Sequence, residues 1–168
     1  CQYRGPIKAL IKALKYQSVL EAGKIGGQLL YYCSWSPADI DCLTAVPLHP
    51  KRQAQRGFNQ AEIMAKTLAG KLNKPYLNLL TRKSNTPQQA KLKDKTARQT
   101  QLKDQITFNH LIPAQNQKLK VDSVLLIDDV VTTGSTLNEC AKVLKCNGVK
   151  KVYGLCLSGV RVRVRLEA

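Results

Sequence analysis

The chain has 168 residues, of which 27 are Lys or Arg and 11 are Asp or Glu, so its formal net charge is +16. This length can bury one hydrophobic core, and the hydrophobic content of 43% is that of a globular protein. The sequence has no apolar run near the roughly 20 residues that a membrane-spanning helix needs, and no secretory signal pattern opens it. Its six cysteines form no Cys-x-x-Cys pair, which favours free thiols in a reducing compartment. We therefore expect a cytoplasmic protein without membrane insertion.

Two helices are predicted near the start of the chain. The first begins at Gly5-Pro6, and its apolar residues recur at the spacing of a helix that packs one face on a core. These apolar residues are Ile7, Leu10, Ile11 and Leu14. The second helix runs from about Val19 to Tyr32, and we expect Gly23 and Gly26-Gly27 to weaken it because glycine is a poor helix former.

A strand, a basic loop and a helix are predicted next. The strand runs from Asp39 to Val46 and ends at Pro47, because proline cannot donate a hydrogen bond within a central strand. The loop extends from Leu48 to Gly57. The residues from Phe58 to Leu72 carry their apolar side chains on one face, which predicts a helix that packs on the sheet. A short second strand is expected from Pro75 to Leu80.

Thr81 to Gln105 lacks apolar periodicity and is rich in Lys, Arg, Gln and Thr. A segment of this length inside a compact domain is usually either functional or disordered. It overlaps the basic region from Lys51 to Lys103, which contains 13 Lys or Arg and two acidic residues. Such an excess indicates a polyanionic partner in addition to a small anionic ligand, and the alternative is a basic surface that aids solubility.

The stretch from Val124 to Thr136 has the pattern of a strand, a polar loop and a helix start. Four apolar residues predict a buried parallel strand that ends at Asp128-Asp129. The residues Thr132 to Thr136 then precede a helical pattern that closes at Asn147-Gly148, and Lys151 to Leu157 predicts a further strand. This order predicts a parallel sheet of βαβ units with its site at the carboxyl ends of the strands.

A junction of this kind favours binding of a phosphorylated sugar. The unpaired amides of the helix start, its dipole and the Thr and Ser hydroxyls direct donors to one place, which suits a phosphate. The paired carboxylates repel a phosphate, so they suit ribose hydroxyls or a Mg²⁺ ion that bridges to further phosphate. The alternative is an ordinary turn between a strand and a helix, with Asp, Ser and Thr acting as caps.

The pattern VLLIDDVVTTGST resembles the phosphoribosyl pyrophosphate (PRPP) signature of the type I phosphoribosyltransferases. Within that superfamily, the chain resembles the ComF/GntX branch of competence proteins from about Tyr3 to Ser158. Three further segments carry this resemblance: Leu10-Ile11 through Leu14-Lys15-Tyr16, Val46-Pro47-Leu48-His49 and Arg56-Gly57-Phe58-Asn59-Gln60.

The resemblance implies three groups of site residues. Asp128 and Asp129 would hold the ribose hydroxyls and contact Mg²⁺, directly or through water, and together with Arg98 they form the expected catalytic set. The expected 5′-phosphate site consists of Val131, Thr132, Thr133, Gly134, Ser135 and Thr136. The expected pyrophosphate site consists of Pro47, Leu48, His49, Lys51, Arg52 and Arg56.

The resemblance also implies a fold and a domain plan. The expected fold is α/β, Rossmann-like, with a parallel sheet flanked by helices and a mobile hood at Thr81 to Gln105. We expect one domain over residues 1–160 and a tail over residues 161–168. Many ComF-like proteins carry a zinc ribbon ahead of this region, so Zn²⁺ is expected only if such a ribbon precedes Cys1.

The function implied is Mg²⁺-dependent binding of PRPP by a phosphoribosyltransferase linked to DNA uptake or to the use of external DNA. The acceptor and the oligomeric state stay open. Two alternatives also remain. One is a PRPP sensor without catalysis, and the other is an accessory of the competence machinery that binds single-stranded DNA and other competence proteins.

Overall fold

The computed structural model describes residues 5–16, 20–32, 39–83, 106–111 and 120–159. Arg98, residues 84–105 of the expected hood and the expected tail lie outside these residues. Within them, no helix is both long enough and apolar enough to cross a membrane.

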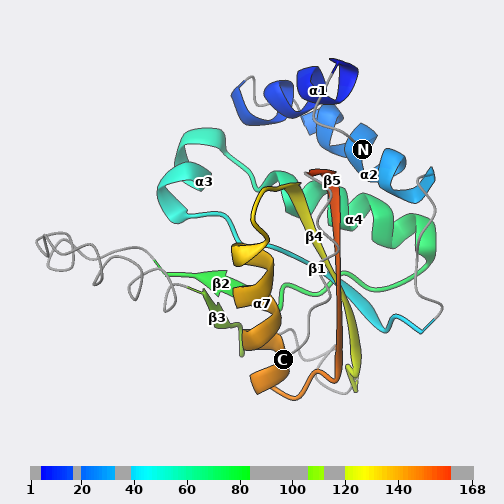
Figure 1. Cartoon of the computed structure of the whole chain (residues 1–168), viewed down its shortest axis with the longest axis vertical. Coiled ribbons are helices and arrows are strands. Elements are labelled where there is room, and N and C mark those ends of the chain that lie inside the picture. The colour runs from blue at the N-terminus through cyan, green and yellow to red at the C-terminus, as the bar shows by residue number, and fades with distance from the viewer. Residues whose placement is uncertain (1–4, 17–19, 33–38, 84–105, 112–119, 160–168) are drawn as a thin grey trace, which may run out of the picture.

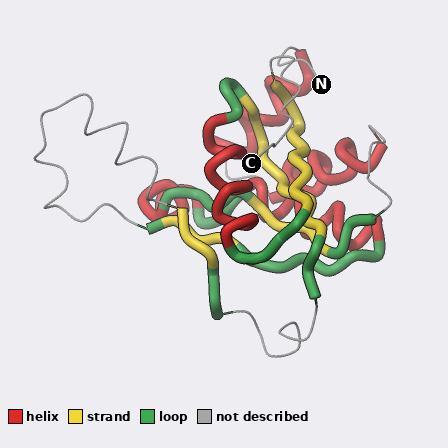
Figure 2. Tube along the Cα trace, turned by 60° about the horizontal axis from the view of Figure 1, so that its bottom comes forward, coloured by secondary structure: helices red, strands yellow, loops and turns green. Residues whose placement is uncertain are grey.

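A parallel sheet forms the centre of the fold. Its three strands are β1 (Cys42–Ala45), β4 (Ser123–Val131) and β5 (Lys151–Gly159), in the order β1-β4-β5. Both pairings are parallel, with Ala45 opposite Ile127 and Leu126 opposite Gly154. Figure 1 shows helices around these strands, and Figure 2 shows the same arrangement turned by 60°. The predicted α/β fold with a parallel sheet flanked by helices is confirmed.

The two faces of β4 belong to different parts of the core. Val124 and Leu126 pack in a cluster that includes residues of α7 (Ser135–Cys146), whereas Leu125 and Ile127 pack in a second cluster with residues of three other helices. Successive side chains of a strand point to opposite faces, so a strand covered on both sides needs an unbroken apolar run. This requirement explains the sequence VLLI.

Three helices cover the face of the sheet that carries Leu125 and Ile127. They are α1 (Gly5–Tyr16), α2 (Leu20–Tyr32) and α4 (Gln60–Leu72). The glycines of α2 face α4 at positions where a larger residue would not fit. A Cβ at Gly27 would lie 2.6 Å from Thr67 Cβ and 2.8 Å from Met64 O, and one at Gly26 would lie 2.8 Å from Met64 Sδ. The glycines therefore allow α2 to pack closely on α4, which offsets their poor helix propensity.

Two predicted segments differ from the structure. The expected strand from Pro75 to Leu80 is reduced to a single bridge between Tyr76 and Leu43, and the chain then forms β2 (Leu80–Arg82). This strand pairs antiparallel with β3 (Ile106–Phe108), which was not predicted. The two strands that flank residues 83–105 in the sequence are therefore neighbours in one ribbon. Each strand has only three residues, too few to produce a recognisable alternation.

Replacing Gly27 by Ala should destabilise the protein by about 1–3 kcal/mol, because the added methyl group meets a backbone carbonyl that cannot rotate away. Gly70 in α4 provides the matched control, since an added Cβ there meets nothing within 4 Å. Gly70→Ala should instead stabilise by roughly 0.5–1 kcal/mol through helix propensity. Urea denaturation of both variants measures the difference, and equal effects would contradict the close packing of α2 on α4.

Candidate functional site

The site lies where β1 ends beside Asp128 and Asp129 of β4. The amide of Val46 donates to Ile127 O at 2.9 Å, which continues the parallel pairing one residue past the end of β1. The loop that follows Val46 therefore leaves the sheet next to Asp128. Two motifs that lie about 80 residues apart in the sequence are brought together by this pairing.

Asp128 and Asp129 belong to β4 itself, which continues to Val131. The prediction that the strand ends at the acidic residues is wrong, because β5 pairs with β4 as far as Gly159 opposite Val131. The amide of Asp129 donates to Asp128 Oδ1 at 2.7 Å, which orients the first carboxylate. Burial, together with the negative charges of Asp128 and Asp129, raises the pKa of the neighbouring Cys156 thiol to about 12, so this thiol stays protonated.

The start of α7 presents donors to solvent. Gly134 is its N-cap with a φ of 78°, a left-handed conformation that glycine adopts without strain, and Ser135 N donates to Thr133 Oγ1 at 3.4 Å. The hydroxyls of Thr133 and Ser135 lie 3.1 Å apart, and Thr133, Ser135 and Thr132 are exposed. This geometry leaves the positive end of the helix dipole available to an anion.

The expected basic loop contains a short helix, α3 (Pro50–Arg56), which was not predicted because it has no buried residue and thus no apolar stripe. His49 caps it, accepting from Lys51 N at Nδ1 over 3.2 Å. Arg52 and Arg56 lie one helical turn apart and both line the pocket. The helix thus presents two guanidinium groups on one side, which a loop would not hold in register.

Desolvation lowers the pKa of His49, and the positive charges of Arg82, Lys51 and Arg52 lower it further. A neutral imidazole is also what the cap requires, since Nδ1 must accept a hydrogen bond from Lys51 N. Arg82, Lys51 and Arg52 therefore produce a positive field around His49.

Three polar residues of the pocket were not assigned a role from the sequence: Asn59, Gln60 and Arg82. Asn59 caps α4 by accepting from Ala61 N at 3.1 Å and donates to Val46 O at 2.9 Å. Its position before a helix is a sequence signal for a cap. Arg82 comes from β2, and no local pattern could place it beside Thr136, because the β2–β3 ribbon was not foreseen.

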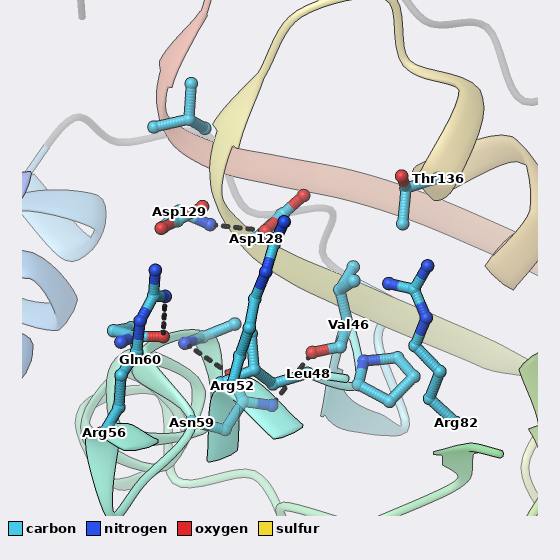
Figure 3. A pocket seen from close by; sticks show the side chains of 13 residues that line it. Val46, Leu48, Arg52, Arg56, Asn59, Gln60, Arg82, Asp128, Asp129 and Thr136 are labelled. Atoms are coloured by element: carbon cyan, nitrogen blue, oxygen red, sulfur yellow. Dashed lines mark hydrogen bonds between the residues drawn. The ribbon is translucent and has the colours of Figure 1, made fainter. Parts of the chain in front are cut away.

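The pocket has a volume of about 210 Å³ and is shown in Figure 3. Arg52 extends toward Asp128, Arg56 lies with Gln60 below Asp129, and Arg82 lies on the side of Thr136. The predicted site residues that line it are Pro47, Leu48, Arg52, Arg56, Asp128, Asp129 and Thr136. The predicted residues of the described chain that do not line it are His49, Lys51, Val131, Thr132, Thr133, Gly134 and Ser135.

The acidic pair suits a Mg²⁺ ion that is shared with a ligand. Among the residues that the structure describes, no group of three or more His, Cys, Asp or Glu side chains could hold a metal by itself. Mg²⁺ is commonly bound by one or two carboxylates together with waters and phosphate oxygens of a substrate. The donor set of Asp128 and Asp129 fits that mode of binding.

Comparisons with known proteins agree with this architecture. The family model for the phosphoribosyl transferase domain matches residues 54–162. Two solved structures share the fold at 16% identity over 83% of this chain and 26% of their own. They are an allosteric regulatory enzyme of purine biosynthesis, with a TM-score of 0.56, and the glutamine PRPP amidotransferase of B. subtilis, with a TM-score of 0.53. The fold is that of the type I phosphoribosyltransferases.

Curated relatives narrow the class. Competence protein F of Haemophilus influenzae is 33% identical over 91% of this chain and 69% of its own length. DNA utilization protein YhgH of Salmonella typhimurium is 33% identical over 92% of this chain, which spans only 61% of that relative. The chain belongs to the ComF family of the type I phosphoribosyltransferase superfamily.

Titration of His49 tests the positive field. Its pKa should lie below the ordinary histidine value of about 6.5 and should rise in Arg82→Gln, which removes one of the charges that lower it. Because folding lowers this pKa, the α3 cap contributes stability above the unfolded-state pKa and loses it as the pH falls through the folded-state value. NMR of the imidazole protons, assigned with His49→Asn, measures the shift. An unchanged pKa in Arg82→Gln would place Arg82 away from His49.

Proposed function

We propose that this protein binds PRPP together with Mg²⁺ and transfers its phosphoribosyl group to an acceptor. The observation that carries the proposal is that one pocket brings Asp128 and Asp129 together with Arg52, Arg56 and Arg82 and with Thr136 at the start of α7. A ligand with ribose hydroxyls between a phosphate and a pyrophosphate matches this order of acceptors and donors.

In this proposal, each group of residues contacts one part of PRPP. The carboxylates of Asp128 and Asp129 accept hydrogen bonds from the ribose 2′- and 3′-hydroxyls. The α7 start, with Thr132 to Thr136, holds the 5′-phosphate. Arg52, Arg56 and Arg82 bind the pyrophosphate, since guanidinium groups match phosphate oxygens in bidentate geometry.

The reaction displaces pyrophosphate from C1 of the ribose, and the site contributes mainly by charge. Positive charge develops on the ribose as the C1–O bond breaks, and Asp128 and Asp129 stabilise it. Negative charge develops on the leaving group, and the three arginines stabilise that charge. Bound Mg²⁺ would supply further neutralisation of the phosphates, with Asp128 and Asp129 as its protein contacts. This division of charge requires no nucleophile from the protein, which agrees with the protonated state of Cys156.

The biological setting proposed is DNA uptake or the use of external DNA. The relatives named competence protein F and DNA utilization protein support this link. A protein that senses PRPP without transferring it would use the same pocket. Assays of pyrophosphate release over a series of acceptors separate the enzyme from the sensor.

Binding of single-stranded DNA is a second candidate function. The observation that favours it is the charge of +16, with 13 basic residues against two acids between Lys51 and Lys103. Lys51 and Arg52 are exposed on α3, so a nucleic acid backbone can reach them. Such binding is dominated by phosphate contacts and depends little on sequence.

PRPP should bind only with Mg²⁺, because its phosphates otherwise meet two carboxylates without a bridging cation. Asp128→Asn and Asp129→Asn should each weaken PRPP roughly 10- to 100-fold, since hydrogen bonds to a charged group are worth about 1.5–3 kcal/mol. The melting temperature of the free protein should not fall, because removing one of two repelling carboxylates relieves strain. Calorimetry with PRPP and MgCl₂ measures the affinity.

Asp39→Asn is the matched control, because it removes the same charge at the amino end of the sheet, where Asp39 pairs with Lys151. This variant should bind PRPP like the unmodified protein. A large loss of stability in both Asp128→Asn and Asp129→Asn would favour a purely structural role for the acidic pair. Tight PRPP binding in EDTA would contradict the role of Mg²⁺.

Single-stranded DNA should bind with a steep salt dependence, each phosphate contact adding roughly 0.7 to the log–log slope. PRPP with Mg²⁺ should compete in part, because Arg52 and Arg56 would contact both ligands. Replacing Lys91, Lys93 and Lys95 together by Gln should weaken DNA while PRPP affinity is largely kept. Fluorescence anisotropy of labelled single-stranded DNA over a salt series measures the affinity and its salt dependence. Absence of binding at ~50 mM salt, where such contacts are strong, would rule out the second candidate function.

A further inference from the structure

Gln60 is a buried polar residue that joins three elements at the pocket. It is the first residue of α4 and is 2% exposed. Its Nε2 donates to Leu14 O in the last turn of α1 at 3.1 Å. Its Oε1 accepts from Arg56 Nη1 at the end of α3 at 3.3 Å. Figure 3 shows this second contact on the side of the pocket below Asp129.

The orientation of this amide follows from its two partners. A carbonyl can only accept and a guanidinium can only donate, so Nε2 must face Leu14 and Oε1 must face Arg56. Both ends of the amide are therefore engaged inside the protein. Gln60 lines the pocket, but its hydrogen bonds hold the wall in place and do not serve a ligand.

The partner in α1 is itself firmly placed. Leu14 and Ile11 are fully buried, and Ile11 packs in the same cluster as Leu30 of α2 and Met64 of α4. Leu14 O also belongs to the last four carbonyls of α1, which have no partner within their own helix. Gln60 satisfies one of them and thus ties the carboxyl end of α1 to the pocket.

We propose that Gln60 is a positioning residue that fixes the guanidinium of Arg56 for an anionic ligand and links that guanidinium to the docking of α1. Arg56 has a long side chain with many rotamers, and a fixed amide oxygen restricts them before the ligand arrives. The negative end of the α1 dipole near the amide adds to this effect. The inference rests on the proposed function for the identity of the ligand, pyrophosphate, and adds a role for the N-terminal helix in the site.

Binding of inorganic pyrophosphate with Mg²⁺, followed by calorimetry, tests the proposal. Gln60→Met keeps a similar side-chain length but can neither accept from Arg56 nor donate to Leu14. It should weaken pyrophosphate by roughly tenfold, the equivalent of about 1.4 kcal/mol. Gln28→Met, on the exposed face of α2, is the matched control and should bind like the unmodified protein.

A double-mutant cycle separates positioning from a general loosening of the fold. If Gln60 acts through Arg56, then Gln60→Met should add little, less than about twofold, to the loss already caused by Arg56→Gln. Hydrogen exchange of the last turn of α1 should also be faster in Gln60→Met and unchanged in Arg56→Gln.

The outcomes are distinguishable. Equal losses from Gln60→Met in the presence and absence of the Arg56 side chain would overturn the positioning role and leave the proposed function intact. Unchanged pyrophosphate affinity in Gln60→Met would do the same. Failure of the unmodified protein to bind either pyrophosphate or PRPP with Mg²⁺ would overturn the proposed function, and the inference with it, because Arg56 would then have no anion to hold.

Discussion

The parallel pairing of β1 with β4 is the constraint on which the site depends. The hydrogen bond from Val46 N to Ile127 O extends this pairing to the point where the segment after β1 leaves the sheet. The segment after β1 carries the arginines of α3, and β4 carries Asp128 and Asp129. A shift of the register by one residue would move the acids away from the arginines and would turn the apolar run of β4 to the wrong faces. The core and the site therefore depend on the same hydrogen bonds.

Opposite charges in this pocket come from separate elements of the fold. The carboxylates are part of the central strand, whereas the guanidinium groups come from α3 and from the β2–β3 ribbon at its borders. Neutral amides lie between the arginines of α3 and the core, with Asn59 bonded to Val46 and Gln60 bonded to Arg56. Such buried amides must have their hydrogen bonds satisfied, so they favour one arrangement of the surrounding backbone over others. That requirement explains why residues that touch no ligand line the pocket.

The helices α1, α2 and α4, which pack on one face of the sheet, also help to hold the pocket in place. Close packing of α2 on α4 through Gly26 and Gly27 brings the N-terminal helices against the core. In turn, α1 places the Leu14 carbonyl within reach of Gln60. A segment that looks peripheral in sequence is thus connected to the pocket through one side chain.

The sequence by itself determined the parallel sheet, the crossover helix and the acidic and hydroxyl residues around Asp128, because each leaves a local signal: an apolar run, a helical period or a cap. The resemblance to the ComF branch also assigned Arg52 and Arg56 to the pyrophosphate site, and both line the pocket. Only the tertiary structure decided the extent of β4, the helix α3 and the location of Arg82. The physical reason is that these features depend on partners distant in the chain: β5 extends β4 past its acidic residues, and β3 holds Arg82. No window of neighbouring residues contains those contacts.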